Sequence, residues 1–66
     1  MYNEYMKSAR LKAGLSQKEV AEALRVSQPQ IARWEQGVGS EPSISRLADL
    51  AALYKISVDE LIGIRQ

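Results

Sequence analysis

The apolar residues of this chain recur every three or four positions, which is the spacing of an amphipathic helix. The first such run consists of Tyr2, Met6, Ala9 and Ala13. Gly14 interrupts the run, as glycine commonly does at the end of a helix, and this predicts a first helix over residues 3–13. No segment alternates with the two-residue period of a strand, so we expect an all-α fold.

Two further stretches show the same apolar spacing. The earlier one contains Val20, Ala21 and Leu24 and predicts a second helix over residues 17–25. The later one consists of Ile44, Leu47, Leu50, Ala51 and Tyr54. It predicts a fourth helix over residues 44–54, with these side chains turned toward the core.

Serine-initiated motifs mark the starts of two helices. Ser16 is followed three residues later by Glu19, and Ser57 is followed in the same way by Glu60. Each pair forms a capping box, in which the serine oxygen and the glutamate each accept an otherwise unpaired backbone N–H. The second box predicts a short fifth helix that runs through Ile62.

The Ser-Gln pair at residues 16–17 recurs at residues 27–28, and it predicts another helix start. Ser27 can cap the N–H of Gln30, and Pro29 falls in the first turn, where its missing N–H is not needed. A third helix over residues 28–36 follows. Because the preceding turn is only a few residues long, the two helices have the arrangement of a helix-turn-helix.

The third helix has one apolar side and one polar side. Ile31 and Trp34 are its only large apolar residues and lie close together at about 100° per residue, so they are the predicted core anchors. The opposite side carries Gln28, Pro29, Ala32, Arg33 and Gln36. Amide and guanidinium groups can read adenine and guanine in the major groove, and small residues allow close approach. The alternative is that these are ordinary solvated side chains.

Composition narrows the classes of function. The chain has 66 residues, 45% of them hydrophobic, with no cysteine and no histidine. We expect one small domain, residues 1–66, whose core forms by apolar packing alone, with no metal or other cofactor. An enzyme is not expected, because the chain offers no histidine or cysteine, no phosphate-binding loop after a strand, and no evident pair of catalytic acids.

The sequence also bears on localisation and on the class of partner, but it restricts them less than composition restricts the function. No apolar run has the length of a membrane span, and the amino terminus has no signal-peptide pattern, so we expect a cytoplasmic protein without a membrane partner. The formal net charge is only +1 and does not by itself indicate a nucleic-acid partner. Nothing in the sequence indicates a small-molecule ligand.

The motifs combine into a recognisable array. The segment RLKAGLSQKEVAEALRVSQPQIARWEQG, followed by PSISRLADLAALYKISVDELIG, resembles the lambda-repressor-like, Cro-type helix-turn-helix family of phage repressors and bacterial regulators. The resemblance covers about residues 6–63. It implies a compact five-helix DNA-binding domain whose second and third helices form the helix-turn-helix.

The resemblance also implies roles for individual residues. It places Gln28, Pro29 and Arg33 at positions that usually touch bases, and Ala32 lies on the same face. It also implies that Ser16, Gln17 and Gln36 contact the DNA backbone. Gln17 is further expected to bind a phosphate and to brace Gln28.

Two charged residues match a structural pair of the family. Arg10 and Glu35 stand where such proteins often form a buried or partly buried salt bridge, the alternative being two independent surface charges. The chain also departs from the family. The loop before Pro42 carries Glu41 and no basic residue, and Lys55 stands where a glycine often ends the fourth helix.

The expected partner is double-stranded DNA, in the form of an inverted-repeat operator bound by a homodimer. Leu53, Ile62 and Ile64 are candidates for a dimer contact, the alternative being isolated exposed apolar residues. We therefore expect a sequence-specific transcriptional regulator that acts as a repressor. The alternative is an antitoxin-like or other protein-interaction module in which DNA binding is secondary.

Overall fold

The computed structural model describes residues 3–63, and all regular structure within them is helical. The elements are α1 (Asn3–Lys12), α2 (Gln17–Leu24), α3 (Gln28–Gln36), α4 (Ile44–Tyr54) and α5 (Val58–Ile62). The all-α class and the five helices are confirmed, and each observed boundary lies within one residue of the expected one. No helix in the described part of the chain is long and apolar enough to cross a bilayer.

Serine caps begin α2, α3 and α5 as expected. The Ser16 and Ser57 capping boxes are both complete, with each serine Oγ accepting the backbone N–H of the glutamate three residues later. Ser27 Oγ accepts the N–H of Gln30 at 3.3 Å, and Pro29 lies in the first turn of α3. A cap of this kind stabilises a protein by about 1 kcal/mol, so these local contacts define where the helices start.

Two helices end on a non-glycine residue with left-handed backbone. Arg25 follows α2 with φ 59°, and Lys55 follows α4 with φ 61°. At position 55, where the family often has glycine, lysine therefore adopts a strained backbone conformation. A residue with a Cβ pays about 1–2 kcal/mol for this conformation.

All five helices contribute to one core. Its buried apolar residues are Met6, Ala9, Val20, Ala21, Leu24, Ile31, Trp34, Leu47, Leu50, Ala51, Tyr54 and Leu61. Both predicted anchors of α3 are among them, with Ile31 1% and Trp34 7% exposed. The burial predicted for α2 is also confirmed.

One inward prediction was wrong. Ile44 is 86% exposed, although it lies on the apolar stripe of α4. A helical wheel treats every turn alike, but Ile44 is the first residue of its helix, where the neighbouring helices no longer cover it. Pro42 in the preceding loop is buried instead. Ala13 is exposed just beyond α1, and Tyr2 lies outside the described residues.

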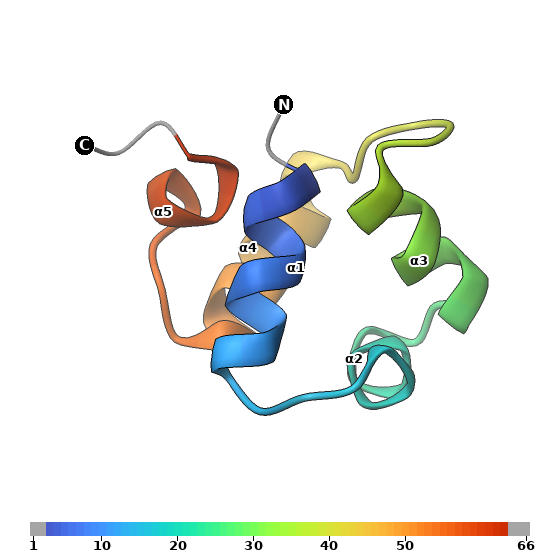
Figure 1. Cartoon of the computed structure of the whole chain (residues 1–66), viewed down its shortest axis with the longest axis horizontal. Coiled ribbons are helices and arrows are strands. Elements are labelled where there is room, and N and C mark those ends of the chain that lie inside the picture. Colours follow the sequence, from blue (N-terminus) through green and yellow to red (C-terminus); the bar gives the residue numbers. More distant parts are fainter. Residues whose placement is uncertain (1–2, 64–66) are drawn as a thin grey trace.

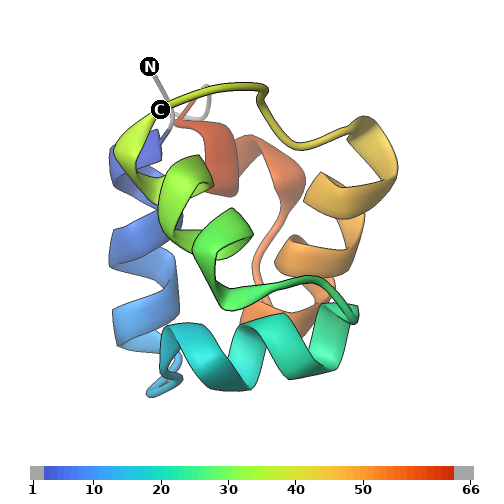
Figure 2. The ribbon, with the colours of Figure 1, turned by 90° about the vertical axis from the view of Figure 1, so that its right-hand side faces the viewer.

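The helices are arranged so that α3 lies at the surface. α1 packs against α3 on one side and α5 on the other, while α2 contacts α3 and α4 (Figure 1). In the view of Figure 2, α3 crosses the front of the molecule, with α2 below it, α1 on one flank and α4 on the other. Within residues 3–63, no other helix therefore covers one long side of α3, and its side chains are exposed there.

Candidate nucleic-acid interface

Three residues, 25–27, connect α2 to α3. The left-handed Arg25 reverses the chain, and the Val26 N–H donates to the Ala21 carbonyl at 3.0 Å, which closes the end of α2. Ser27 then caps α3. With Val26 packed against the core, this turn holds the two helices at a defined angle.

The outer face of α3 carries the residues expected to meet bases. Gln28, Pro29, Arg33 and Gln36 are exposed, and Ala32 is half-buried. α3 has nine residues and is thus about 13 Å long, which matches about four base pairs. An α-helix fits the major groove, which is about 12 Å wide. The arrangement therefore presents two amides and one guanidinium on a helix of suitable length.

The N-terminus of α2 supplies backbone donors. Ser16 Oγ accepts the Glu19 N–H at 3.0 Å, and the Glu19 carboxylate accepts the Ser16 N–H at 2.8 Å. The N–H groups of Gln17 and Lys18, the first two residues of α2, have no partner within the helix and can face an anion. The hydrogen bond from the Ser16 backbone, and then that from its side chain, lowers the pKa of Glu19. Glu19 thus keeps a negative charge at this end, which opposes a phosphate.

A buried ion pair ties α1 to α3. Arg10 Nε lies 2.7 Å from Glu35 Oε2 and its second nitrogen, Nη2, lies 3.2 Å from Glu35 Oε1. Arg10 is 7% and Glu35 8% exposed, so the expected buried salt bridge is confirmed. Arg10 also donates to the Leu15 carbonyl at 2.9 Å. Hydrogen bonding to Glu35 raises the pKa of Arg10 against the opposing effect of burial, so the guanidinium remains charged.

Gln17 makes a contact that the sequence did not predict. Its Nε2 donates to Glu35 Oε1 at 3.1 Å, so that α1, α2 and α3 all meet at one carboxylate. Among the described residues no hydrogen bond joins Gln17 to Gln28, and the expected brace is absent from the free chain. A buried carboxylate is a stronger acceptor than a neutral amide, which explains the preference.

Arg46 is a second positioning residue that sequence reasoning missed. Its Nη1 donates to the Leu24 carbonyl at 2.9 Å and lies 3.8 Å from Asp49 Oδ2. This hydrogen bond satisfies the carbonyl of the last residue of α2, beside the turn, and so joins α4 to the end of α2. The i,i+3 spacing of Arg46 and Asp49 indicates their ion pair, but no sequence signal reveals a contact across 22 positions.

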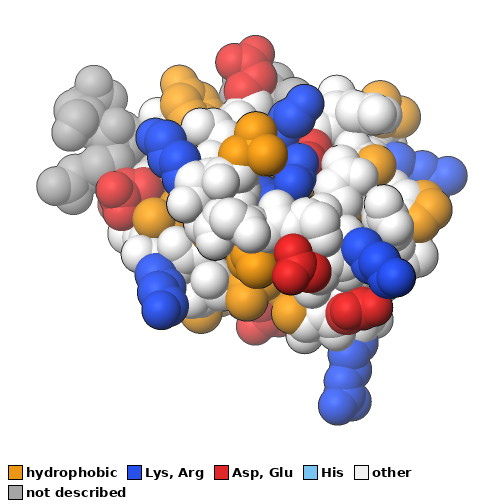
Figure 3. Space-filling view, turned by 60° about the horizontal axis from the view of Figure 1, so that its bottom comes forward, with side chains coloured by type: hydrophobic (Ala, Val, Ile, Leu, Met, Phe, Trp, Pro, Cys, Tyr) orange, Lys and Arg blue, Asp and Glu red, His pale blue; other side chains and the backbone are white. Residues whose placement is uncertain are grey.

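The charged side chains on the face drawn in Figure 3 are of both signs, with Lys and Arg interspersed with Asp and Glu. This agrees with the net charge of +1. Any selectivity for DNA must therefore come from placed contacts rather than from a strongly basic surface.

The structure has the parts of a helix-turn-helix. They are a tight turn between α2 and α3, a capped and exposed α3, and the buried Arg10–Glu35 ion pair that holds α3 from beneath. A family model described as helix-turn-helix matches residues 6–61. The chain belongs to this family of lambda-repressor-like helix-turn-helix domains.

Curated relatives support the same assignment. The chain is similar to the HTH-type transcriptional activator BcrR of Enterococcus faecalis, with 33% identity over 94% of this chain and 30% of that protein. It is also similar to the HTH-type transcriptional regulator ImmR of Bacillus subtilis (strain 168), with 38% identity over 88% of this chain and 45% of that protein. The helix-turn-helix chain thus spans less than half the length of either relative.

The candidates for a dimer contact lie away from α3. Leu53 and Ile62 are half-buried and pack against the core, because α5 folds back onto α4. Neither is therefore the fully exposed apolar residue that the alternative interpretation described. Ile64 lies outside the described residues.

Proposed function

We propose that this chain is a DNA-binding domain of a transcriptional regulator and that it reads double-stranded DNA through α3. The observation that carries the proposal is the exposed face of α3, where Gln28, Arg33 and Gln36 are displayed on a capped helix with a buried opposite side. The helix-turn-helix family and the two transcriptional relatives support it.

In the proposed complex, α3 enters the major groove. Gln28 and Arg33 are the base-reading groups, for adenine and guanine respectively, while Pro29 and Ala32 permit close approach and apolar contact with a thymine methyl. Pro29 has no N–H, and Ser27 takes that of Gln30, so side chains rather than backbone amides of α3 supply the readout.

Phosphate contacts fix the register of the helix. The N–H groups at the start of α2 supply two of these contacts. The side chains of Ser16, Gln17 and Gln36 supply further contacts to the DNA backbone. The Gln17 amide has a second N–H besides the one given to Glu35, so it can serve both partners. The Arg10–Glu35 pair and Arg46 hold these elements in place without touching DNA.

A homodimer on an inverted repeat is the proposed assembly, because one domain of this size contacts few base pairs and two-fold pairing doubles the contact. We propose a cytoplasmic repressor that acts by occupying a promoter, which requires only binding. One of the two relatives is named an activator. Repression by this chain is therefore tested on the chain itself, by measuring transcription from a promoter that contains its binding site.

Selection of bound sites from random duplex DNA, at two salt concentrations, tests the proposal. We expect an inverted repeat with half-sites about 34 Å apart, and a Gln28→Ala/Arg33→Ala variant of unchanged fold that loses this enrichment. A single enriched half-site would refute the homodimer but keep the reading role of α3. Absence of enrichment, with binding lost at moderate salt, would leave only phosphate contact and favour a protein-interaction module.

A further inference from the structure

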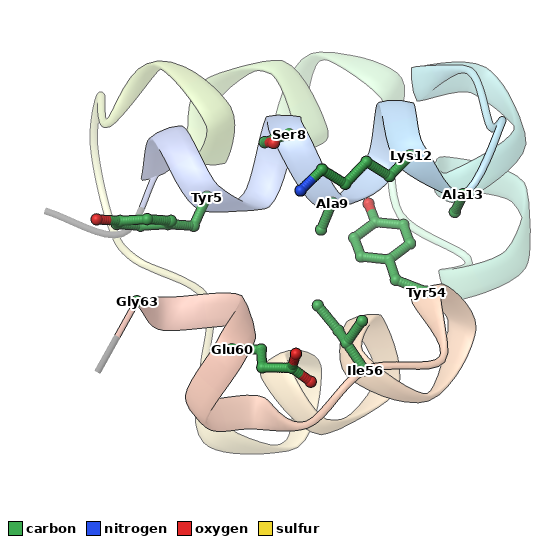
Figure 4. A pocket seen from close by; sticks show the side chains of 9 residues that line it. All are labelled: Tyr5, Ser8, Ala9, Lys12, Ala13, Tyr54, Ile56, Glu60 and Gly63. Atoms are coloured by element: carbon green, nitrogen blue, oxygen red, sulfur yellow. The ribbon is translucent and has the colours of Figure 1, made fainter. Parts of the chain in front are cut away.

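A cavity of about 390 Å³ lies between α1 and the segment from the end of α4 to the end of α5 (Figure 4). α1 separates the cavity from α3, because it packs against α3 on one side and α5 on the other. No residue of the proposed DNA interface lines the cavity. Its size lies near the lower end of small-molecule sites, which start at about 300 Å³.

Tyr54 places a hydrogen-bond donor in this cavity. The residue is 6% exposed, and its hydroxyl points toward the α1 wall (Figure 4). Among the described residues no hydrogen bond engages this hydroxyl, and no fully buried side-chain oxygen lacks a partner, so the hydroxyl opens onto the cavity. Burial, and then the charge of Glu35, raises the pKa of Tyr54 to about 12. The phenol is therefore a donor at neutral pH and fits an acceptor on a ligand.

Opposite charges face each other across the cavity. Lys12 lies along the α1 wall and Glu60 lies on the α5 wall (Figure 4). The ion pairs found in residues 3–63 do not join them, so they are more than 4.0 Å apart. Glu60 uses Oε1 to accept from Ser57, which leaves its second oxygen for another donor. A ligand with a negative and a positive group could satisfy both walls at once.

Apolar groups line the rest of the cavity. The Tyr5 ring closes one end by packing onto Gly63, where an added Cβ would overlap the ring. Ile56 projects into the space from the other wall, and Ala9 keeps the α1 wall shallow (Figure 4). The cavity therefore has room for an apolar side chain beside its two charged walls.

We propose that this cavity binds a small zwitterion with an apolar side chain, of the class of the aromatic and branched-chain α-amino acids. The ligand carboxylate accepts from Lys12 and from the Tyr54 hydroxyl, and its ammonium donates to Glu60. Its side chain lies between Tyr5 and Ile56. This assignment does not rest on DNA binding, and its test does not use DNA.

Amide-resolved NMR titration of the whole chain with L-phenylalanine and L-leucine tests the proposal. We expect concentration-dependent shifts in α1 and in residues 54–63, with none in α3. Phenylpropionate lacks the ammonium and loses the hydrogen bond to Glu60, so it should bind about tenfold more weakly than phenylalanine. Phenethylamine lacks the carboxylate and loses the hydrogen bonds from both Lys12 and Tyr54, so its affinity should fall by more than about tenfold. Glycine has no apolar side chain and should bind more weakly still.

Three variants assign the contacts. Lys12→Gln and Glu60→Gln should each weaken phenylalanine about tenfold, and glutamine at position 60 can still complete the capping box. Tyr54→Phe removes only the hydroxyl and should weaken binding severalfold. Lys18→Gln, which makes the same charge change on α2, is the matched control and should leave binding unchanged.

Titrating each variant with the analogue that lacks the matching group tests each contact separately. Lys12→Gln should not change the affinity for phenethylamine, which has no carboxylate, and Glu60→Gln should not weaken phenylpropionate. The proposal is overturned if neither amino acid shifts any amide at millimolar concentration. It is also overturned if the shifts fall on α3, or if the three cavity variants bind phenylalanine as the unchanged chain does.

Discussion

Arg10 and Glu35 are 25 positions apart in the chain, yet their side chains form a buried bidentate pair with an Nε–Oε2 distance of 2.7 Å. Gln17 donates to the same carboxylate, so one acidic group joins the three helices that form and support the candidate interface. The geometry of α3 therefore depends on a contact that has no local counterpart in the sequence.

Removing one partner of this pair should cost more than removing both. Glu35→Gln leaves the Arg10 guanidinium buried without a counter-charge and should lower the unfolding free energy by about 3–5 kcal/mol. Arg10→Met/Glu35→Leu replaces the pair with apolar groups and should be more stable than Glu35→Gln. Urea unfolding of the variants measures this, and a double variant that is the least stable of the set would contradict it.

Tyr54 makes stability depend on alkaline pH. Its pKa rises from 10.0 to about 12 on folding. Below pH 10 both states hold the proton, whereas between pH 10 and 12 the unfolded chain loses it first, so stability falls by about 2–3 kcal/mol. The difference in unfolding free energy between the parent chain and Tyr54→Phe should change by this amount across that range. A constant difference would show that the phenol is not the titrating group.

Lys55 should be replaceable with a gain in stability. Its left-handed φ of 61° is one that glycine adopts without strain, so Lys55→Gly should raise the unfolding free energy by about 0.5–1 kcal/mol. Lys55→Ala keeps the Cβ and should bring no gain. Chemical denaturation of the two variants side by side distinguishes relief of backbone strain from loss of the charge.

Trp34 fills the core beneath α3. It is 7% exposed, and Trp34→Ala should lower the unfolding free energy by about 3–5 kcal/mol through the cavity it leaves. Trp34→Phe retains most of the ring volume and should cost less. Thermal unfolding followed by circular dichroism measures both, and an unchanged melting temperature for Trp34→Ala would rule out this core role.

Arg33 should read a base. Arg33→Ala should weaken binding to the selected DNA site by about 1–3 kcal/mol and relax the preference at one base pair. Arg33→Lys keeps the charge but loses the bidentate geometry, so it should retain salt dependence and lose discrimination. Binding measured on the site and on its single-base variants checks this. An equal loss on every sequence would make Arg33 a phosphate contact instead.

Local signals in the sequence are sufficient to place the helices. Capping boxes such as Ser16 with Glu19, and the first-turn Pro29, act over three residues or fewer, and each appears where expected. The buried side of α3 also follows from the sequence, because Ile31 and Trp34 are the only large apolar residues that could define it. Local hydrogen bonds and one apolar stripe are sufficient for both predictions.

The long-range contacts, in contrast, depend on how the helices pack against one another. Gln17 could have faced Gln28, and Ile44 fits the apolar stripe of α4, but the packing of neighbouring helices gives the first a carboxylate and leaves the second uncovered. The Arg46 bond to the Leu24 carbonyl and the cavity beside Tyr54 arise in the same way. Helical periodicity specifies the side of a helix that is apolar, whereas burial and pairing depend on which other helix reaches each turn.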